Sequence, residues 1–275
     1  MNQRWMFIAG AILTVVVLFV VLGRNKNPDG GTGESASSSV ASGNVKKLYE
    51  EATGLESDGK KMEAKTAYQK LMSEHPDSDQ IESIQKHLGE LNLGIITSKI
   101  ETPDTIMHDV QPGDSLGKLA KQYGTTVDLI KKSNNLKSDV IRAGQSLRIW
   151  KGQFSIFVDK SQNILILKSG DEVVKVYNVS TGENNSSPVG TFKIVSKLVD
   201  PVWFKSGAVV PPQSPDNVLG TRWMGFDIAG FGIHGTTEPD KIGQQVTAGC
   251  VRMRNAEVEE LYTLIPMGTS VQIVD

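Results

Sequence analysis

The sequence holds very little cysteine and carries no excess of positive charge. Cys250 is the only cysteine among 275 residues, which excludes an intrachain disulfide and a cysteine-rich structural metal site. Lysine and arginine number 29 against 31 acidic residues, a formal net charge of -2. No overall basic field would therefore attract nucleic acid, and we expect no nucleic-acid partner. Whatever Cys250 does, it does as a free thiol.

Charge is also missing from one stretch near the start of the chain. Residues 5–22, WMFIAGAILTVVVLFVVL, hold no charged side chain and one polar one, Thr14. Their length is close to the roughly 20 residues that cross a membrane. No small-residue cleavage site closes the stretch, since Arg24 and Lys26 follow it, so we predict an uncleaved N-terminal transmembrane helix and a membrane anchor over residues 1–24.

Composition divides the next hundred residues into a linker and a helical unit. Residues 25–43 are rich in Gly, Ser, Asn and Asp and predict a flexible linker. Over residues 44–98 apolar side chains recur at helical spacing, with breaks at Gly54–Gly59 and at Pro76, so we predict three helices. The unit resembles a tetratricopeptide repeat with one added helix, a short all-α helical-repeat unit. It would serve either as a spacer or as a surface for a protein partner.

Residues 106–150 predict a short strand, two short helices and a closing strand, with Asp114 as a candidate cap of the first helix. The blocks QPGDSL, YGTTVDLIKKSNNL and AGQSLRI resemble the LysM module nearly from end to end. The resemblance implies a small βααβ fold that binds peptidoglycan glycan, with Gly113, Asp114 and Asn134 among its contacts. The alternative is a small stabilising fold without a ligand.

Short runs of β-branched and aromatic residues predict a sheet-rich domain over residues 153–275. Examples are ILIL at 164–167 and VVKVY at 173–177, separated by Gly, Asn and Ser. One helix is expected from Ala256 to Ile265, with Asn255 as its cap. The chain as a whole is predicted to be a multidomain α+β protein.

A histidine and the cysteine lie 16 residues apart in glycine-rich surroundings, in the blocks GIHG and AGCVRMRN. The imidazole of His234 can take the thiol proton, and the N–H groups around Gly249 and Cys250 can form an oxyanion hole. Arg252 would raise the local positive potential, so that the thiolate becomes accessible near neutral pH. This pattern predicts a cysteine nucleophile with a histidine base.

Residues 154–275 resemble the L,D-transpeptidase catalytic domain, through the blocks SPVGTFKI, GFGIHGTTEPDKIG and TAGCVRMRNAEVEELY. The resemblance implies a sandwich-like β fold, with Cys250 as nucleophile and His234 as base. The further residues that it implies at the site are Gly249 and Arg252 in the catalytic machinery and Gly235, Thr236 and Asn255 near the substrate. One position departs from the commonest family pattern, because Ala248 stands where a histidine usually precedes the Gly-Cys pair.

The resemblance implies acyl transfer on peptidoglycan stem peptides, through a thioester at Cys250 and without metal or organic cofactor. An amine acceptor would form a 3→3 cross-link, water would make the enzyme an L,D-carboxypeptidase, and a protein lysine would make it a protein-to-wall ligase. Ala248 leaves open a catalytically inactive peptidoglycan-binding scaffold. We expect a single-pass cell-membrane protein with its catalytic domain on the extracytoplasmic side, in the periplasm or cell wall.

Overall fold

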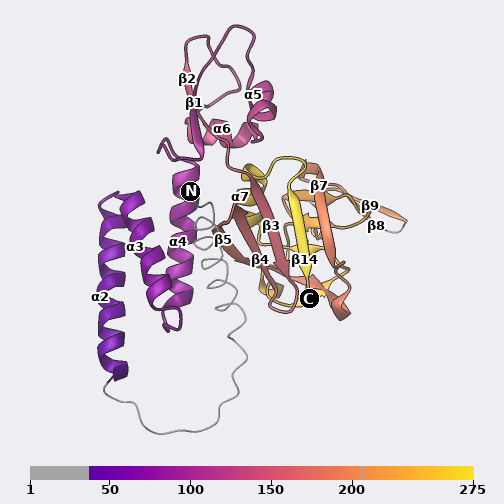
Figure 1. The fold of residues 1–275 in the computed structure, drawn as a ribbon. Helices are drawn as coiled ribbons and strands as arrows, with labels where there is room; N and C mark the ends of the chain where they lie inside the picture. The colour runs from indigo at the N-terminus through magenta and orange to yellow at the C-terminus, as the bar shows by residue number, and fades with distance from the viewer. Residues whose placement is uncertain (1–36, 206, 213) are drawn as a thin grey trace, which may run out of the picture. The chain divides into compact units, whose positions relative to one another are not determined.

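The computed structural model describes residues 37–205, 207–212 and 214–275 (Figure 1). Contacts group the chain into two units, the first formed by the helices up to Ile95 with residues 171–175, the second by residues 96–170 and 176–275. The predicted membrane anchor lies outside the described residues. Within the described ranges, no helix combines the length and the apolar character that a membrane crossing needs.

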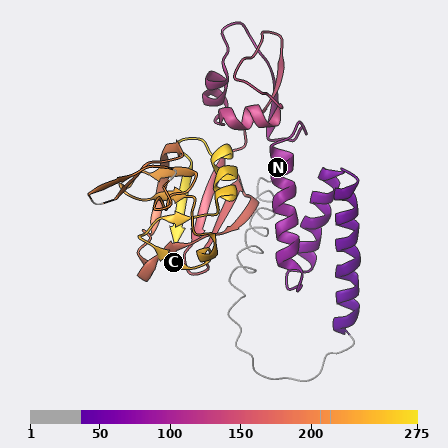
Figure 2. The same cartoon turned by 180° about the vertical axis from the view of Figure 1, so that it is seen from behind.

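Three helices make up most of the first unit: α2 (Ser37–Ser57), α3 (Lys61–Glu74) and α4 (Ile81–Ile96). They lie side by side in Figures 1 and 2. Gly59 adopts a positive φ of 76° between α2 and α3, a conformation that glycine reaches without steric cost. Apolar faces meet in a core that includes Tyr68, Leu71 and Ile84, each almost fully buried. The three predicted helices are confirmed, while the tetratricopeptide assignment stays a prediction.

The predicted linker over residues 25–43 is wrong in its last part, because α2 already begins at Ser37. Helix growth adds one hydrogen bond for each residue that is fixed, once a first turn exists. The helix formed by residues 44–57 therefore extends backward through Val40 and Ala41, in spite of the surrounding serines and glycine. The rest of the predicted linker, residues 25–36, lies outside the described residues.

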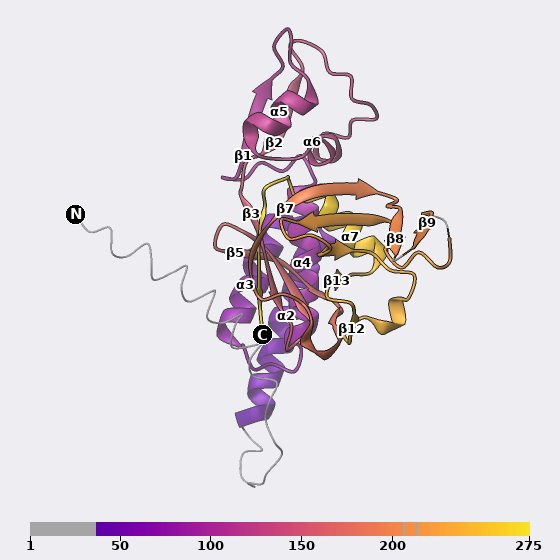
Figure 3. The same ribbon diagram turned by 90° about the vertical axis from the view of Figure 1, so that its right-hand side faces the viewer.

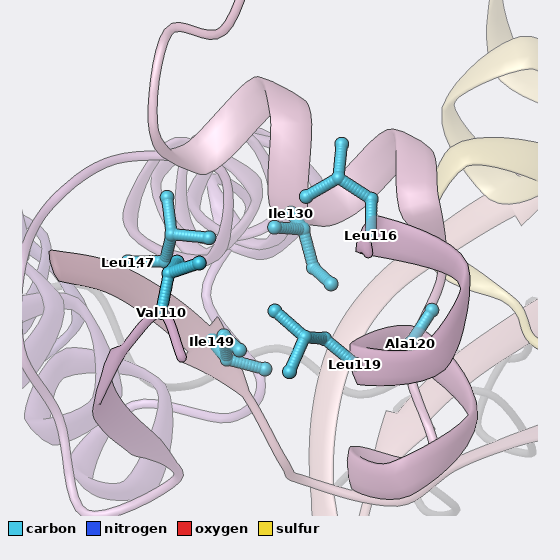
Figure 4. Packing of buried hydrophobic residues seen from close by; sticks show 7 residues of the cluster. All are labelled: Val110, Leu116, Leu119, Ala120, Ile130, Leu147 and Ile149. Carbon is cyan, nitrogen blue, oxygen red and sulfur yellow. The ribbon is translucent and has the colours of Figure 1, made fainter. Parts of the chain in front are cut away.

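The second unit begins with the predicted strand–helix–helix–strand module. Its elements are β1 (Thr105–Asp109), α5 (Leu116–Tyr123), α6 (Val127–Ser133) and β2 (Ser146–Trp150), with β1 and β2 antiparallel. Apolar side chains from α5, α6, β2 and the residue directly after β1 close a small core, which Figure 4 shows from close by. The core consists of Val110, Leu116, Leu119, Ala120, Ile130, Leu147 and Ile149.

The cap of α5 differs from the prediction. Ser115 accepts the hydrogen bond from the Lys118 backbone N–H and is the N-cap residue, rather than Asp114. Asp114 turns back toward β1, where its carboxylate accepts from the Gln111 backbone N–H and lies 2.9 Å from Nε2 of His108. The Asp114 carboxylate therefore bonds to a backbone N–H of the turn before the helix, and Ser115 bonds to the free N–H at the start of the helix.

The sheet-rich domain carries the remaining strands and one helix. Hydrogen bonds join eight strands into one mixed sheet in the order β13-β11-β10-β7-β14-β3-β4-β5, while β6 pairs with β12 and β8 with β9. The helix α7 (Asn255–Leu264) and two short 3₁₀ turns, η1 (Glu183–Asn185) and η2 (Pro239–Lys241), complete it. The strands are β3 (Phe154–Asp159), β4 (Ile164–Ser169), β5 (Glu172–Asn178), β6 (Thr181–Gly182), β7 (Gly190–Val199), β8 (Trp203–Lys205), β9 (Ala208–Val210), β10 (Arg222–Phe226), β11 (Gly232–His234), β12 (Gln245–Thr247), β13 (Val251–Arg252) and β14 (Ser270–Val274).

Strand β7 changes partners in its middle and so divides the sheet into two halves. Residues 190–193 pair with β14, whereas residues 194–199 pair with β10. A strand that serves two sheets in this way forms the corner of sandwich-like folds. The predicted β-rich fold is confirmed, and the strands predicted from the runs at 164–167 and 173–177 are β4 and β5. The β8–β9 hairpin extends from the sheet in Figure 3.

Candidate active site

Strand pairing brings the predicted nucleophile and base to one face of the sheet. Strands β11 and β13 run parallel, with Ile233 opposite Val251. Cys250 comes directly before β13 and is therefore level with Gly232, whose backbone is hydrogen-bonded to the thiol. Side chains two residues apart on a strand point the same way, so His234 shares the face of Gly232 and Cys250. The 16-residue separation in sequence is closed by this one parallel pair.

The imidazole of His234 has a defined proton position. Its Nδ1 lies 2.7 Å from the carbonyl oxygen of Gly235. Because a carbonyl can only accept, Nδ1 carries the proton and donates, which leaves the lone pair of Nε2 free to act as a base. Burial lowers the pKa of His234 to about 4, helped by Arg252 and opposed by the Gly235 carbonyl, so the ring is neutral at neutral pH.

The pKa of the Cys250 thiol differs from the expectation drawn from Arg252. Burial raises the pKa of Cys250 above its ordinary value, while the backbone of Gly232 and the charge of Arg252 lower it by less. The predicted ready thiolate near neutral pH is therefore wrong for the resting site. The free energy needed to take a thiolate out of water is larger than the stabilisation that one nearby cation provides. A neutral thiol beside a neutral imidazole means that the proton has to move during attack.

Arg252 also has a partner that its sequence neighbourhood did not predict. It is 6% exposed, and its Nη1 lies 3.1 Å from a carboxylate oxygen of Glu238, which is bonded to Lys241 as well. The ion pair offsets part of the field that Arg252 exerts on the thiol. Arg252 stands opposite His234 in the β11–β13 pair and two residues after Cys250, so it shares their face of the sheet as a buried charge held by Glu238.

The turn that holds Cys250 depends on Gly249 and on Thr247. Gly249 has a φ of 121°, and a Cβ there would lie 2.6 Å from the Phe231 ring and 3.1 Å from the Ser186 carbonyl oxygen. Only glycine fits. The Thr247 hydroxyl accepts from the Gly249 N–H at 3.2 Å and donates to the Cys250 carbonyl at 2.7 Å. The Gly249 N–H is therefore already used, which removes it from the predicted oxyanion hole and leaves the Cys250 N–H.

Trp223 packs against the base and was not predicted. It lies opposite His234 in the β10–β11 ladder, and the two rings are stacked with centroids 6.0 Å apart. The indole occupies a slot made by two glycines, since a Cβ at Gly225 or Gly232 would lie within 3 Å of it. The sequence contained a signal in retrospect, because glycines in neighbouring strands indicate a close approach by a bulky neighbour.

The residues predicted to contact substrate beside the base use their polar groups internally. The Gly235 N–H donates to the Arg222 carbonyl, and the Thr236 hydroxyl accepts from the Glu238 N–H. The side-chain oxygen of Asn255 accepts from the backbone N–H of Thr236 at 2.9 Å and of Thr221 at 3.3 Å. Asn255 is also the first residue of α7 and not its cap. These contacts support the loops around His234 and leave few groups for a substrate.

The predicted glycan contacts of the LysM-like module are likewise engaged. The Asn134 amide donates to the carbonyls of Ile130 and Arg148 and accepts from the Arg148 N–H, so it ties α6 to β2. Gly113 has a φ of 91° and its carbonyl accepts from Lys118 Nζ. With Asp114 bonded to His108, these residues shape the loops, and their direct contact with glycan stays a prediction.

Residues 153–273 match the family model of the L,D-transpeptidase catalytic domain, YkuD, and residues 108–150 match that of the LysM domain. YqjB of Bacillus subtilis is 40% identical over 126 residues, which cover 44% of this chain and 70% of that protein. YkuD of Bacillus licheniformis is 31% identical over 176 residues, which cover 61% of this chain and 98% of that protein. Both bear the L,D-transpeptidase name.

Among solved structures, L,D-transpeptidase 3 of Mycobacterium tuberculosis is similar at 17% identity and a TM-score of 0.39, over 48% of this chain and 65% of that chain. The two Bacillus relatives support the assignment to a family, because they are more than 30% identical and are covered over 70% and 98% of their own length. With an imidazole and a lone thiol on one face of the sheet, and a LysM domain before them, this chain belongs to the L,D-transpeptidase family.

Proposed function

We propose that this chain is a membrane-anchored peptidoglycan L,D-transpeptidase that forms 3→3 cross-links through a thioester on Cys250. The observation that carries the proposal is the pair itself. The only thiol of the chain lies on the same sheet face as an imidazole whose Nδ1 proton is held by a backbone carbonyl. Such a pair is the arrangement that nucleophilic cysteine catalysis requires.

In the first half-reaction, Nε2 of His234 takes the thiol proton as Sγ attacks the carbonyl carbon of the third stem residue. The C–N bond to the terminal D-alanine then breaks, the leaving amine receives the proton from His234, and the acyl group stays on sulfur. In the second half, the amine of a neighbouring stem gives its proton to His234 and attacks the thioester. The C–S bond breaks as the new amide forms, which is the cross-link, and the sulfur takes the proton back from His234, which restores the thiol.

The tetrahedral oxyanion needs a donor, and the Cys250 backbone N–H is the group we assign. The Gly249 N–H is committed to Thr247, whereas the Cys250 N–H has no acceptor among the described residues. A backbone N–H fixed in a rigid turn stabilises developing negative charge without reorganising. The Thr247 hydroxyl fixes that turn from both ends, through Gly249 and the Cys250 carbonyl.

The same site would serve water or a protein lysine as acceptor, so a carboxypeptidase and a protein-to-wall ligase share this chemistry. The inactive scaffold is less consistent with the structure, because base, nucleophile and turn are assembled around the exposed Ala248 without a second imidazole. We regard Ala248 as a position that tunes the rate.

Location completes the proposal. The apolar residues 5–22 would hold the chain in the cell membrane with the catalytic domain outside the cytoplasm, and the LysM domain would hold it on the glycan. Two tethers raise the effective concentration of an insoluble substrate around the site. The helical unit remains a candidate surface for a protein partner.

A protein that begins at Ser37, the first residue of α2, should leave the membrane fraction and keep its chemistry on soluble muropeptides, because the missing residues contribute location only. Mass spectrometry of the products tests the function directly, since a cross-linked dimer, a tripeptide and a lysine adduct differ in mass. Only tripeptide in the presence of acceptor stems would show a carboxypeptidase. Absence of any product would contradict the proposed activity, and membrane retention would contradict the anchor.

The LysM domain should bind peptidoglycan by itself, because residues 106–150 close their own core. We expect a fragment of these residues to sediment with purified sacculi. The whole chain should sediment equally well with Cys250 present or replaced, because binding to glycan does not use the thiol. Pelleting assays with and without sacculi measure this. Equal pelleting in both tubes would mean that the domain only stabilises its neighbours.

A further inference from the structure

The peptide bond between Gly235 and Thr236 is held at both ends. Its carbonyl accepts the Nδ1 proton of His234 at 2.7 Å, and its N–H donates to the side-chain oxygen of Asn255 at 2.9 Å. Both hydrogen bonds belong to one rigid planar group, so they fix a single orientation of that plane. If the plane turned over, the carbonyl would leave His234 and the N–H would take its place.

The position of Asn255 is tightly determined. A Cβ at Gly220 or at Gly235 would lie 2.2 Å from its side-chain oxygen, so both neighbours have to be glycine. The same oxygen accepts the Thr221 N–H, which joins the loop before β10 to the loop after β11. Asn255 stands in the first turn of α7, whose buried face anchors the residue in the core of the domain.

We propose that Asn255 is a positioning residue that sets the tautomer of His234 through the peptide between Gly235 and Thr236. The inference rests on the proposed function, because the tautomer matters for catalysis only if Nε2 of His234 is the base. The order of groups is Asn255 oxygen, Thr236 N–H, Gly235 carbonyl, His234 Nδ1–H. An accepted hydrogen bond at the N–H end polarises the peptide and makes its carbonyl a better acceptor.

The consequence is a base that is always presented correctly. Which ring nitrogen of a histidine carries the proton is set by the hydrogen bond that the other makes. Without Asn255 the peptide can turn, and part of the protein would then carry the proton on Nε2, where it cannot accept one from the thiol. The loss would fall on the turnover rate and leave substrate binding nearly unchanged.

The test is nitrogen-15 NMR of the full chain in detergent micelles, labelled at its four histidines. His234→Gln identifies the His234 signals. We expect the Nδ1–H tautomer in the wild type and a mixed population in Asn255→Ala. In the same variant kcat should fall about tenfold to a hundredfold with little change of KM, by analogy with the removal of the partners that orient metal-bound histidines. The NMR readout does not require turnover, so an inactive wild type would refute the proposed function and leave this inference testable.

Two further variants separate positioning from simple loop support. Asn255→Asp keeps an acceptor oxygen in place and should keep both the tautomer and most of the rate, which also covers the case in which Asn255→Ala does not fold. Asn217 is fully buried and braces the same loop, donating to the Pro201 carbonyl and accepting from the Leu219 N–H. Asn217→Ala should lower thermal stability and leave the His234 tautomer unchanged. A wild-type tautomer in Asn255→Ala, a lost one in Asn255→Asp, or an equal shift in Asn217→Ala would overturn the proposal.

Discussion

Cys250→Ala should form no covalent adduct with a tetrapeptide donor or a carbapenem, and its transpeptidation should be abolished. The chain has no second cysteine, so no other thiol can take over the attack. Cys250→Ser should behave in the same way, because a serine hydroxyl ionises far less readily than a thiol and its environment is tuned for sulfur. Intact-mass spectrometry after incubation with each acylating agent measures the adduct directly.

The loss should not come from unfolding. The thiol donates a weak hydrogen bond to the Gly230 carbonyl at 3.5 Å and accepts one from the Gly232 backbone, so its removal should shift the thermal midpoint little. Ala248→His is the matched control beside it, since it alters the neighbouring exposed residue and supplies the imidazole that the family commonly has there. It should keep the adduct and change the rate modestly. An adduct that persists in Cys250→Ala would place the chemistry on another residue.

Removal of the base should have the second largest effect. His234→Ala and His234→Gln should acylate about 10²–10⁴-fold more slowly at neutral pH, the usual contribution of a positioned general base. The glutamine variant matters because His234 is 3% exposed, and a side chain of similar size avoids the cavity that alanine leaves. Equal loss in both variants separates the missing base from disturbed packing.

The dependence on pH should differ between these proteins in a defined direction. In the wild type the pKa of His234 is lowered to about 4, so the neutral base persists well below pH 6.5 and kcat/KM should fall only as the pH approaches 4. In the variants the thiol has to ionise unaided. Since burial raises the pKa of Cys250, their rate should keep rising into the alkaline range.

Stopped-flow acylation at constant ionic strength, from acid to alkaline pH, would show both the fall of the wild-type rate in acid and the rise of the variants' rate in alkali. An acid limb of the wild type near 6.5 would mean that His234 is exposed to water when it reacts. Full activity of His234→Gln at neutral pH would exclude His234 as the base.

The sequence by itself determined the kinds of residue and most of the elements. A lone cysteine, a glycine-flanked histidine and the strand runs at 164–167 and 173–177 were readable because each is a local pattern. Local patterns also predicted the three helices and the βααβ module, since helix and strand periodicity are written within a few residues. They failed where a helix grew past its pattern, at residues 37–43, and where Ser115 rather than Asp114 capped α5.

Only the tertiary structure decided how the site works. The pairing of β11 with β13 puts thiol and imidazole together, and no spacing rule specifies a parallel pair between two such short strands. Burial lowers the pKa of His234 and raises the pKa of Cys250, the latter against the simple expectation from Arg252, because desolvation depends on every neighbour of a group. The uses of Thr247, Trp223 and Asn255 are likewise contacts between distant parts of the chain, and those are fixed only when the chain has folded.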